Sequence, residues 1–278
     1  MPELVEIEVL RRDLEKEVVG RRIKDAEIRP GTNAMKVVPK HGRRKEFTEL
    51  LEGAKVEKVE RAGKKILLDL DNDHVITVDL GPGGQLLKTS ASDEVAAHTH
   101  IIVPFTIGGQ MRYLDPIREG EVWVAPRAEA QIARDFAIDP LEQMVAWQTF
   151  SQVLSDQDVG MKELLMDESF ICGLGDIYSD EILFAAGLRH DRFSSNLSSQ
   201  DVRRLYRALM ETMQEAIKAR GTSYGEVPFT DIHGDPGQYQ LELKVYDREG
   251  EFCRRCRNNI VKEKVGKWIT YFCPQCQT

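Results

Sequence analysis

Four cysteines near the carboxyl end of the chain have the spacing of a metal site. They form two Cys-x2-Cys pairs separated by sixteen residues, namely Cys253, Cys256, Cys273 and Cys276. Two such pairs can bring four thiolates to the tetrahedral positions that Zn²⁺ prefers, with a β-hairpin between them. Disulfides or redox dithiols are the alternative, which the lack of a signal peptide disfavours because cytosolic thiols stay reduced. The spacing predicts a zinc ribbon with one structural Zn²⁺, and the apolar neighbours of Cys172 predict a buried core residue.

The first residues carry groups that could act as a nucleophile and its proton-transfer partners. Removal of Met1 would leave Pro2 with a free secondary amine, and an α-amino group with a pKa of about 8 is roughly one-tenth neutral at pH 7. Such an amine can attack a sugar C1′ or an aldehyde. Glu3 and Glu6 can lie on one side of it as acid, base or orienting groups. The structural alternative is that proline and acidic residues simply favour the start of a helix.

The elements that must position these residues follow from hydrophobic periodicity. Apolar residues three and four apart predict a helix over residues 1–20 that ends at Gly20. An antiparallel sandwich or barrel is indicated by β-rich runs at 55–60, 66–70, 75–80, 100–107 and 110–114. Residues 36–45 are predicted to form a loop that interrupts the β-rich region of residues 22–124. Helical periodicity then appears at 128–136, 140–155, 162–166, 177–186 and 200–219.

The remaining segments are a long loop and a short strand. Residues 221–239 contain four glycines and two prolines, and a loop of this length in a compact protein is usually functional or mobile. Residues 240–246 alternate like a strand and lead into the cysteines. The loss of β-type patterning places a domain boundary near 126–138.

Composition excludes several classes of protein. The 278 residues are 41% hydrophobic and 30% charged, without an apolar run long enough to span a membrane. The net charge of -8 argues against a generic basic nucleic-acid binder. Residues 1–65 carry 17 basic and 13 acidic side chains, residues 66–237 carry 13 and 28, and residues 238–278 carry 8 and 5. Two basic ends could still bind a polyanion if they share one face.

Further motifs resemble one protein family. The chain opens Met-Pro-Glu-Leu-x-Glu and closes Cys-Pro-x-Cys-Gln; between these lie Arg61-Ala62-Gly63-Lys64, Leu80-Gly81-x-Gly83-Gly84-x-Leu86, His98-Thr99-His100, Asp115-Pro116, Leu165-Met166-Asp167 and the run 173–184. In order and spacing they resemble the formamidopyrimidine-DNA glycosylase/Nei family over the whole chain, and 173–184 is similar to its helix-two-turn-helix signature. The resemblance implies a two-domain α+β fold. Residues 1–130 would form a leading helix and antiparallel β-sandwich, residues 131–238 a helix-two-turn-helix domain with the loop 221–239, and residues 239–278 the zinc finger.

The resemblance also implies a chemistry. A damaged base is flipped out of DNA, Pro2 attacks C1′, and the resulting iminium permits β- and then δ-elimination. Glu3 would transfer protons, Glu6 would organise the active site, and Lys64 would be a cation near phosphate or the leaving group. Contacts to DNA would fall on Arg118, Lys162, Asp176, Tyr178, Lys267 and Trp268.

Several positions depart from the family where it touches DNA. Members usually fill the void left by the flipped nucleotide with Met, Arg and Phe, where this chain has Pro82, Ile117 and Glu119. A carboxylate beside stacked bases is both repelled and desolvated. The usual His, Asn and finger Arg are replaced by Asp79, Asp176 and Trp268. Binding to ordinary duplex is therefore expected to be weak. Either the substrate is a single strand, bulge or cross-linked base, on which Trp268 could stack, or the scaffold serves another ligand.

Three hypotheses follow. The first is a bifunctional DNA glycosylase and AP lyase, a monomer in the bacterial cytosol, that acts on damaged or abasic DNA. The second is a non-catalytic zinc-dependent nucleic-acid or lesion-binding protein on the same fold. The third is a zinc-ribbon module that binds protein through the acidic middle of the chain.

Overall fold

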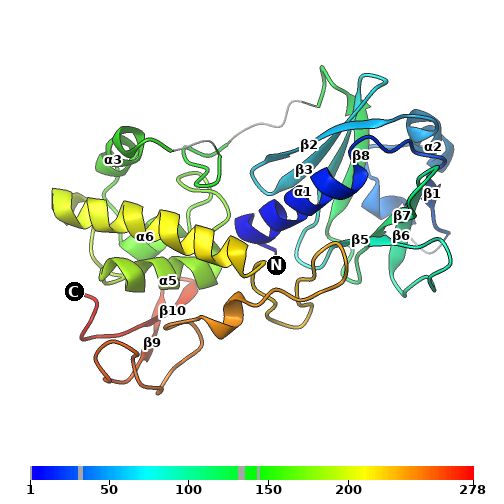
Figure 1. The fold of residues 1–278 in the computed structure, drawn as a ribbon. Helices are drawn as coiled ribbons and strands as arrows, with labels where there is room; N and C mark the ends of the chain where they lie inside the picture. The colour runs from blue at the N-terminus through cyan, green and yellow to red at the C-terminus, as the bar shows by residue number, and fades with distance from the viewer. Residues whose placement is uncertain (1, 31–33, 131–134, 143–144) are drawn as a thin grey trace. The chain divides into compact units, whose positions relative to one another are not determined.

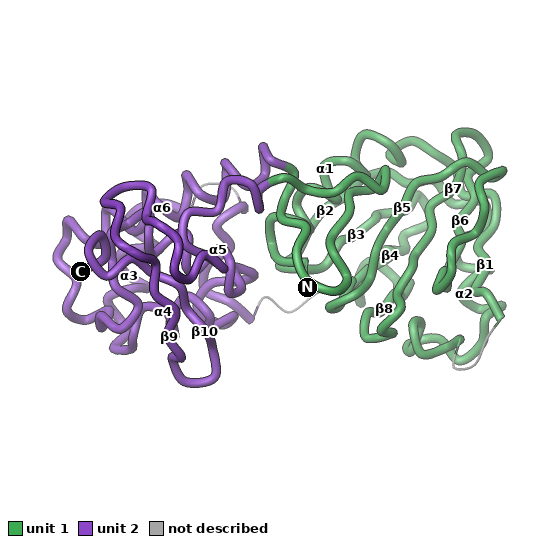
Figure 2. The backbone as a smooth tube through the Cα atoms, turned by 90° about the horizontal axis from the view of Figure 1, so that it is seen from below, with its two compact units in different colours: residues 1–133, 220–238 green, residues 134–219, 239–278 purple. Residues whose placement is uncertain are grey.

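The chain folds into two compact units (Figure 1; Figure 2). The structure is a computed structural model that describes residues 2–30, 34–130, 135–142 and 145–278. Unit 1 contains residues 1–133 and 220–238, and unit 2 contains residues 134–219 and 239–278. The segment 220–238 thus belongs with the β-sheets of unit 1, whereas the sequence had assigned it to the helical domain.

Unit 1 is built from two antiparallel four-stranded sheets. Their strand orders are β1-β6-β7-β5 and β2-β3-β4-β8. The elements are α1 (Leu4–Val18), β1 (Glu27–Ile28), the 3₁₀ turn η1 (Ala34–Val37), α2 (Arg44–Leu51), β2 (Val56–Ala62), β3 (Lys65–Leu70), β4 (His74–Asp79), β5 (Gln85–Thr89), β6 (Thr99–Pro104), β7 (Gln110–Leu114) and β8 (Glu121–Pro126). Alternate residues of β3 are buried, as expected for a strand with one face on the core.

Helix α1 contributes its apolar stripe to the same core. Ile7, Leu10, Leu14 and Val18 are almost completely buried, and their spacing of three and four places them on one helical face. The helix starts with a capping box, in which the side chains of Glu3 and Glu6 each accept from the other's backbone N–H. Helix initiation and the core together fix where the amino terminus lies in unit 1.

A buried ion pair fastens α1 to strand β2. Glu8 is 6% exposed and accepts from Arg61 at 3.2 Å and from Arg12 at 2.7 Å. Burial alone would raise the pKa of Glu8, but hydrogen bonds from Arg11 and Arg12 outweigh it and hold the pKa below its ordinary value. The carboxylate of Glu8 therefore stabilises the fold when it is ionised.

Replacement of Glu8 by glutamine is expected to lower the free energy of unfolding at pH 7 by about 2 kcal/mol, since it removes the buried negative charge that pairs with Arg61, Arg11 and Arg12. Because the pKa of Glu8 is lowered in the folded protein, its ionised carboxylate contributes fully to stability at pH values above the pKa of the unfolded chain, which is about 4.3. This contribution is lost as the pH falls through the lower pKa of the folded protein. Urea unfolding at pH 7 and at pH 3 should show the difference between the two proteins shrinking at the lower pH. A difference independent of pH would contradict this role of the ionised carboxylate.

Unit 2 consists of helices with a two-stranded hairpin. Its elements are α3 (Trp147–Ser155), α4 (Met161–Leu165), α5 (Gly175–Ala186), η2 (Ser194–Asn196), α6 (Ser199–Lys218), η3 (Tyr239–Leu241), β9 (Val261–Val265) and β10 (Trp268–Phe272). Ser198 and Asp201 form a capping box at the start of α6. Gly187, in the left-handed region with φ 70°, ends α5.

Two buried carboxylates of α5 join the helices to the carboxyl-terminal segment. Asp180 accepts from the Thr270 hydroxyl at 2.6 Å and from the Tyr271 N–H at 2.8 Å. Glu181 accepts from the N–H groups of Lys244, Val245 and Tyr246. Burial raises the pKa of both carboxyls, against the lowering effect of these donors.

The fold class predicted from the sequence is confirmed, and some local predictions are wrong. Residues 240–246 form no strand, because three of their backbone donors bond to Glu181 instead of to a neighbouring strand. The helix expected at 128–136 is absent from its described part: residues 127–129 form a turn, and residues 130, 135 and 136 have no regular secondary structure. Residues 131–134 lie outside the described residues. The helix expected at 140–155 begins only at Trp147. Strands β1, β5 and β8 and helix α2 were not predicted.

Candidate active site and zinc centre

The carboxylate of Glu6 accepts hydrogen bonds from two backbone N–H groups, one from the neighbouring Glu3 and one from the remote Thr222. Glu6 is 2% exposed. Its Oε2 accepts from the Glu3 N–H at 2.9 Å, and its Oε1 accepts from the Thr222 N–H at 2.8 Å. Gly221 approaches so closely that a Cβ on it would lie 2.8 Å from Oε1 of Glu6. The first turn of α1 and the segment 220–238 therefore form one site within unit 1.

Lys64 is brought to the same place by a tight hairpin. Gly63 and Lys64 are the two residues between the paired ends of β2 and β3, and Gly63 has the positive φ that such a turn requires. The Lys64 Nζ lies 3.5 Å from the Glu3 Oε2. Pro2 and Lys64 both line a small cavity with Ile7, Asp79, Leu80 and Gly81. The four residues proposed from the sequence as catalytic thus gather in unit 1.

This arrangement provides a nitrogen at the chain start, two carboxylates and a cation. If Pro2 is the terminal residue, its amine can attack an electrophilic carbon. The carboxylate of Glu3 is close enough to the Lys64 ammonium for an ion pair. The hydrogen bonds from Glu3 and Thr222 hold the Glu6 carboxylate at the start of the helix. Acid, base and electrostatic roles are therefore available around one nucleophile.

The three positions where the family usually fills the void lie on two adjacent loops of unit 1. Asp115 organises one of them, since it accepts from the Ile117 N–H at 3.0 Å and from the Gly120 N–H at 2.9 Å. Ile117 packs against Gly83 in the other loop, next to Pro82, so that a Cβ on Gly83 would lie 2.8 Å from it. Ile117 is 42% exposed, and Glu119 is also exposed. The side chains at these three positions are a proline ring, an aliphatic group and a carboxylate.

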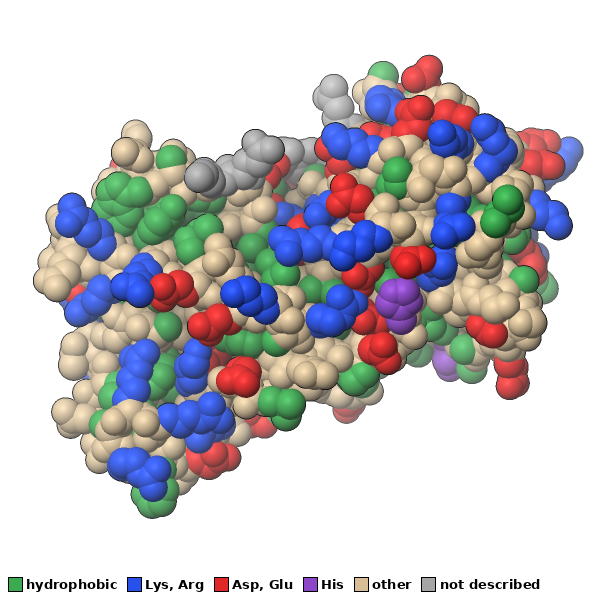
Figure 3. Space-filling view, in the orientation of Figure 1, with side chains coloured by type: hydrophobic (Ala, Val, Ile, Leu, Met, Phe, Trp, Pro, Cys, Tyr) green, Lys and Arg blue, Asp and Glu red, His purple; other side chains and the backbone are tan. Residues whose placement is uncertain are grey.

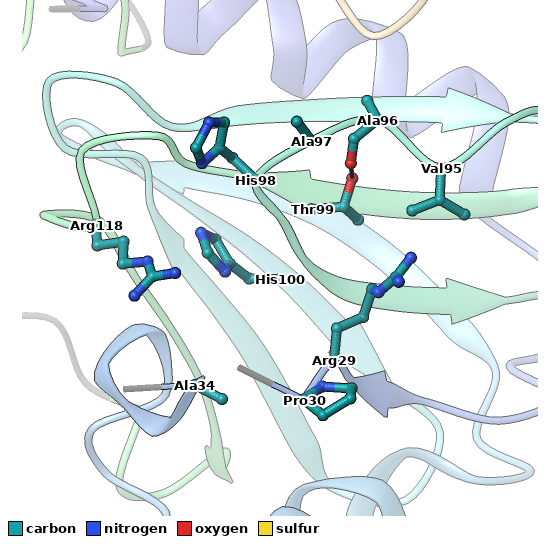
Figure 4. A pocket seen from close by; sticks show the side chains of 10 residues that line it. All are labelled: Arg29, Pro30, Ala34, Val95, Ala96, Ala97, His98, Thr99, His100 and Arg118. Atoms are coloured by element: carbon teal, nitrogen blue, oxygen red, sulfur yellow. Dashed lines mark hydrogen bonds between the residues drawn. The ribbon is translucent and has the colours of Figure 1, made fainter. Parts of the chain in front are cut away.

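A cationic cavity lies beside these loops (Figure 4). Its volume is about 300 Å³, and its lining includes Arg29, His98, His100 and Arg118. The His100 Nε2 lies 2.7 Å from the Asp115 carbonyl, which orients that ring. His98 and Arg118 both have a positive φ near 60°. Sequence reasoning proposed Arg118 but not Arg29 or the histidines, although the His98-Thr99-His100 motif was a signal for them.

The DNA-contacting positions proposed in unit 2 have different environments. Lys162 is completely buried, and its ammonium donates to Asp180 at 2.8 Å and to the Ser179 hydroxyl at 2.7 Å. Tyr178 is 1% exposed and packs against Tyr239 with ring centroids 5.8 Å apart. The side chain of Asp176, in the first turn of α5, is 48% exposed. A direct phosphate contact by Lys162 would require it to leave the Asp180 carboxylate.

The four cysteines of the two pairs come together in unit 2. All four Sγ atoms lie within 4.8 Å of one another, with Cys253 and Cys276 3.8 Å apart and Cys256 and Cys273 3.4 Å apart. Zn–S bonds of about 2.3 Å in a tetrahedron place the sulfurs about 3.8 Å apart, so the cluster fits a structural zinc ion. The Arg255 N–H donates to the Cys253 Sγ at 3.4 Å, a contact that stabilises the charged thiolate form. Cys172 is buried elsewhere in the core.

The tip of the zinc ribbon carries the last two DNA-contact candidates. Lys267 is exposed and Trp268 is half-buried, and the Lys267 Nζ lies 5.0 Å from the Trp268 ring centroid. Further Lys and Arg side chains gather over α6 and the ribbon (Figure 3). Those that line a groove there are already bonded to protein groups, such as Arg207 to Glu211 and Arg255 to the Phe184 carbonyl. The exposed pair at the tip is the better candidate for a ligand.

Comparison with known families decides the classification. Residues 1–122 match the model of the formamidopyrimidine-DNA glycosylase N-terminal domain, residues 136–226 match the H2TH domain of that enzyme, and residues 250–278 match a zinc finger found in FPG and IleRS. The chain belongs to the formamidopyrimidine-DNA glycosylase family. The family assignment, the helix-two-turn-helix domain and the structural zinc finger predicted from the sequence are thereby confirmed.

Relatives of the family match the chain from end to end. A formamidopyrimidine-DNA glycosylase of Pelotomaculum thermopropionicum is 35% identical over all of this chain and 99% of its own length. A solved complex of Lactococcus lactis Fpg with DNA containing an abasic site is similar with a TM-score of 0.86, at 27% identity and 99% coverage of both chains. The MutM (FPG) protein of Thermus thermophilus has a TM-score of 0.83 at 30% identity, covering 99% of this chain and 98% of that one. Within the described residues, no helix is sufficiently long and apolar to traverse a bilayer.

Proposed function

We propose that this member of the formamidopyrimidine-DNA glycosylase family removes damaged bases and also cleaves the strand at abasic sites. The observation that carries the proposal is the convergence of Pro2, Glu3, Glu6 and Lys64 in unit 1, with the Lys64 Nζ 3.5 Å from the Glu3 Oε2 beside the cavity that Pro2 lines. The relatives are named formamidopyrimidine-DNA glycosylases, and one is solved with abasic-site DNA.

In the proposed reaction the amine of Pro2, freed by removal of Met1, attacks C1′ of the damaged nucleotide. The C1′–base bond breaks, the base leaves with a proton, and the ring-opened sugar is bound to the proline as an iminium. The positive charge acidifies C2′, so loss of a C2′ proton expels the 3′ phosphate by β-elimination. A second proton loss expels the 5′ phosphate by δ-elimination, and water releases the sugar fragment from Pro2. Glu3 transfers protons, and Lys64 stabilises negative charge on the leaving group.

The proposed substrate is DNA that lacks an intact opposite strand at the lesion. The cationic cavity with Arg118 can bind a phosphate, and Lys267 with Trp268 offers charge and a stacking face. By contrast, Pro82, Ile117 and Glu119 provide no large side chain to replace a flipped base. Single strands and bulges need no such replacement.

Borohydride reduction, which traps an iminium, tests this function. Protein that intact mass shows to begin at Pro2 should form a covalent adduct with an abasic-site oligonucleotide. The adduct should form on single-stranded substrate at least as fast as on duplex. If no covalent adduct formed on either substrate, the proposed enzymatic function would be wrong. Retained DNA binding would then favour the non-catalytic lesion-binding alternative, and no binding even at low salt would favour the protein-binding module. Faster trapping on duplex would overturn only the strand preference.

A further inference from the structure

The guanidinium of Arg220 links the segment 220–238 to α1. Arg220 Nε donates to the Asp231 Oδ2 at 3.0 Å, and its Nη1 donates to the Asp13 Oδ1 at 3.4 Å. Its Nη2 bonds to both carboxylates. The side chains of Asp13 and Asp231 are 8% and 3% exposed. The hydrogen bond with Asp13 raises the pKa of Arg220, so the guanidinium stays charged and the link is ionic.

Asp231 also holds the far end of the segment in shape. Its Oδ1 accepts from the His233 N–H at 2.9 Å and from the Asp235 N–H at 3.0 Å. The Lys88 N–H on β5 donates to the Ile232 carbonyl at 2.7 Å. One end of the Arg220 link is therefore a helix, and the other end is a turn that is itself anchored to a sheet.

The backbone beside this link is the part that contacts Glu6. Arg220 has a φ of 61° and Gly221 a φ of 81°. A non-glycine residue pays a conformational cost in this region and stays there only when its surroundings hold it. Thr222, two residues after the arginine, donates its N–H to the Glu6 Oε1 at 2.8 Å. The ionic contacts of Arg220 therefore hold the backbone conformation in which the Thr222 N–H points at the Glu6 carboxylate.

We propose that Arg220 is a positioning residue for the Glu6 carboxylate, acting through the Thr222 N–H with Asp13 and Asp231 as its anchors. Arg220 does not touch the reacting atoms. Without it, the backbone at Thr222 would be held less firmly, and the hydrogen bond that Thr222 donates to Glu6 would open more often. The catalytic consequence rests on the proposed function, but the positioning itself does not.

Two measurements on Arg220→Met test the proposal. Amide hydrogen exchange at Thr222 should become at least about tenfold faster, because opening of that donor is no longer opposed by the ion pairs. The rate of borohydride trapping on abasic-site DNA should fall by at least about tenfold at saturating DNA, with the affinity for DNA unchanged, as expected for a defect in the chemical step. Arg220→Lys should restore part of both effects, and Asp13→Asn should reproduce them if the methionine variant folds poorly.

The matched control is Arg127→Met. The Arg127 Nη1 lies 3.5 Å from the Asp69 Oδ2, so this pair also joins two elements of unit 1, but it involves neither α1 nor the segment 220–238. It should leave both Thr222 exchange and the trapping rate as in the unaltered protein. In a double-mutant cycle, Arg220→Met should slow trapping little further once Glu6 is changed to Gln, because the two changes act through one carboxylate.

The outcomes separate the two proposals. Unchanged exchange at Thr222 in Arg220→Met would overturn the positioning role whatever the activity. Faster exchange with an unchanged trapping rate would show that Glu6 does not depend on this link, and would overturn the catalytic consequence. Absence of any adduct from unaltered protein would overturn the proposed function, while the exchange measurement would still decide the positioning.

Discussion

Pro2→Gly is expected to reduce covalent trapping on abasic-site DNA by roughly 10³-fold, within the range seen when a nucleophile is removed from an active site. The proline amine is secondary, so its adduct with C1′ is a charged iminium at any pH. Glycine supplies a primary amine, whose imine is neutral until it is protonated and withdraws electrons less. Glycine also lacks the ring that fixes the direction of the nitrogen before Glu3.

The measurement is single-turnover trapping with borohydride, on protein whose intact mass shows that Met1 is absent. Pro126→Gly is a matched control at the exposed end of β8, and it should trap at the unaltered rate. Protein that retains Met1 should also fail to trap, because its Pro2 nitrogen is an amide. Full trapping by Pro2→Gly would show that another amine forms the adduct.

Loss of one zinc ligand is expected to unfold the ribbon. Cys273→Ser should lower the zinc content measured by mass spectrometry from one ion per chain to well below one. It should also lower the melting temperature by more than about 10 °C, since a structural zinc contributes on the order of 10 kcal/mol to folding. The core around the cysteines is small, with Phe184, Val245, Ile260 and Tyr271 as its other buried members. A two-stranded hairpin with so little apolar surface is not stable by itself.

The control for this change is Cys172→Ser. Cys172 is 2% exposed but lies outside the cluster, so its replacement should keep one zinc ion per chain even if it costs some stability. Chelation of zinc from the unaltered protein should reproduce the effect of Cys273→Ser and expose the amides of β9 and β10 to exchange. A Cys273→Ser protein with full zinc content and an unchanged melting temperature would contradict the assignment of this ligand.

The parts of the fold that could be predicted are those in which local pattern and tertiary contact agree. Helix α1 and strand β3 bury the faces that their periodicities indicate. The strand expected at 240–246 does not form because backbone N–H groups of that segment donate to the carboxylate of Glu181. Glu181 lies about sixty positions earlier in the chain, and the alternation of side chains carries no information about it. A buried acceptor that is remote in sequence leaves no periodic signal.

The same distinction applies to the candidate site. Pro2, Glu3 and Glu6 were accessible to sequence reasoning because they are neighbours in one helical turn, and the zinc ligands were accessible because their spacing is diagnostic. Lys64 required the family motif. Thr222 and Arg220 were missed because they contact residues more than two hundred positions away. The burial of Lys162 was missed because its partner Asp180 lies on another helix.

Because segment 220–238 returns to unit 1, neither unit is a continuous stretch of chain. A fragment ending at residue 133 would leave Asp13 without Arg220, and a fragment beginning at residue 134 would carry residues 220–238 as an internal loop without the sheets of unit 1. Dissecting this protein into independently expressed halves therefore calls for a circular permutation or a linker that bypasses residues 220–238, whereas a single cut between the halves damages both.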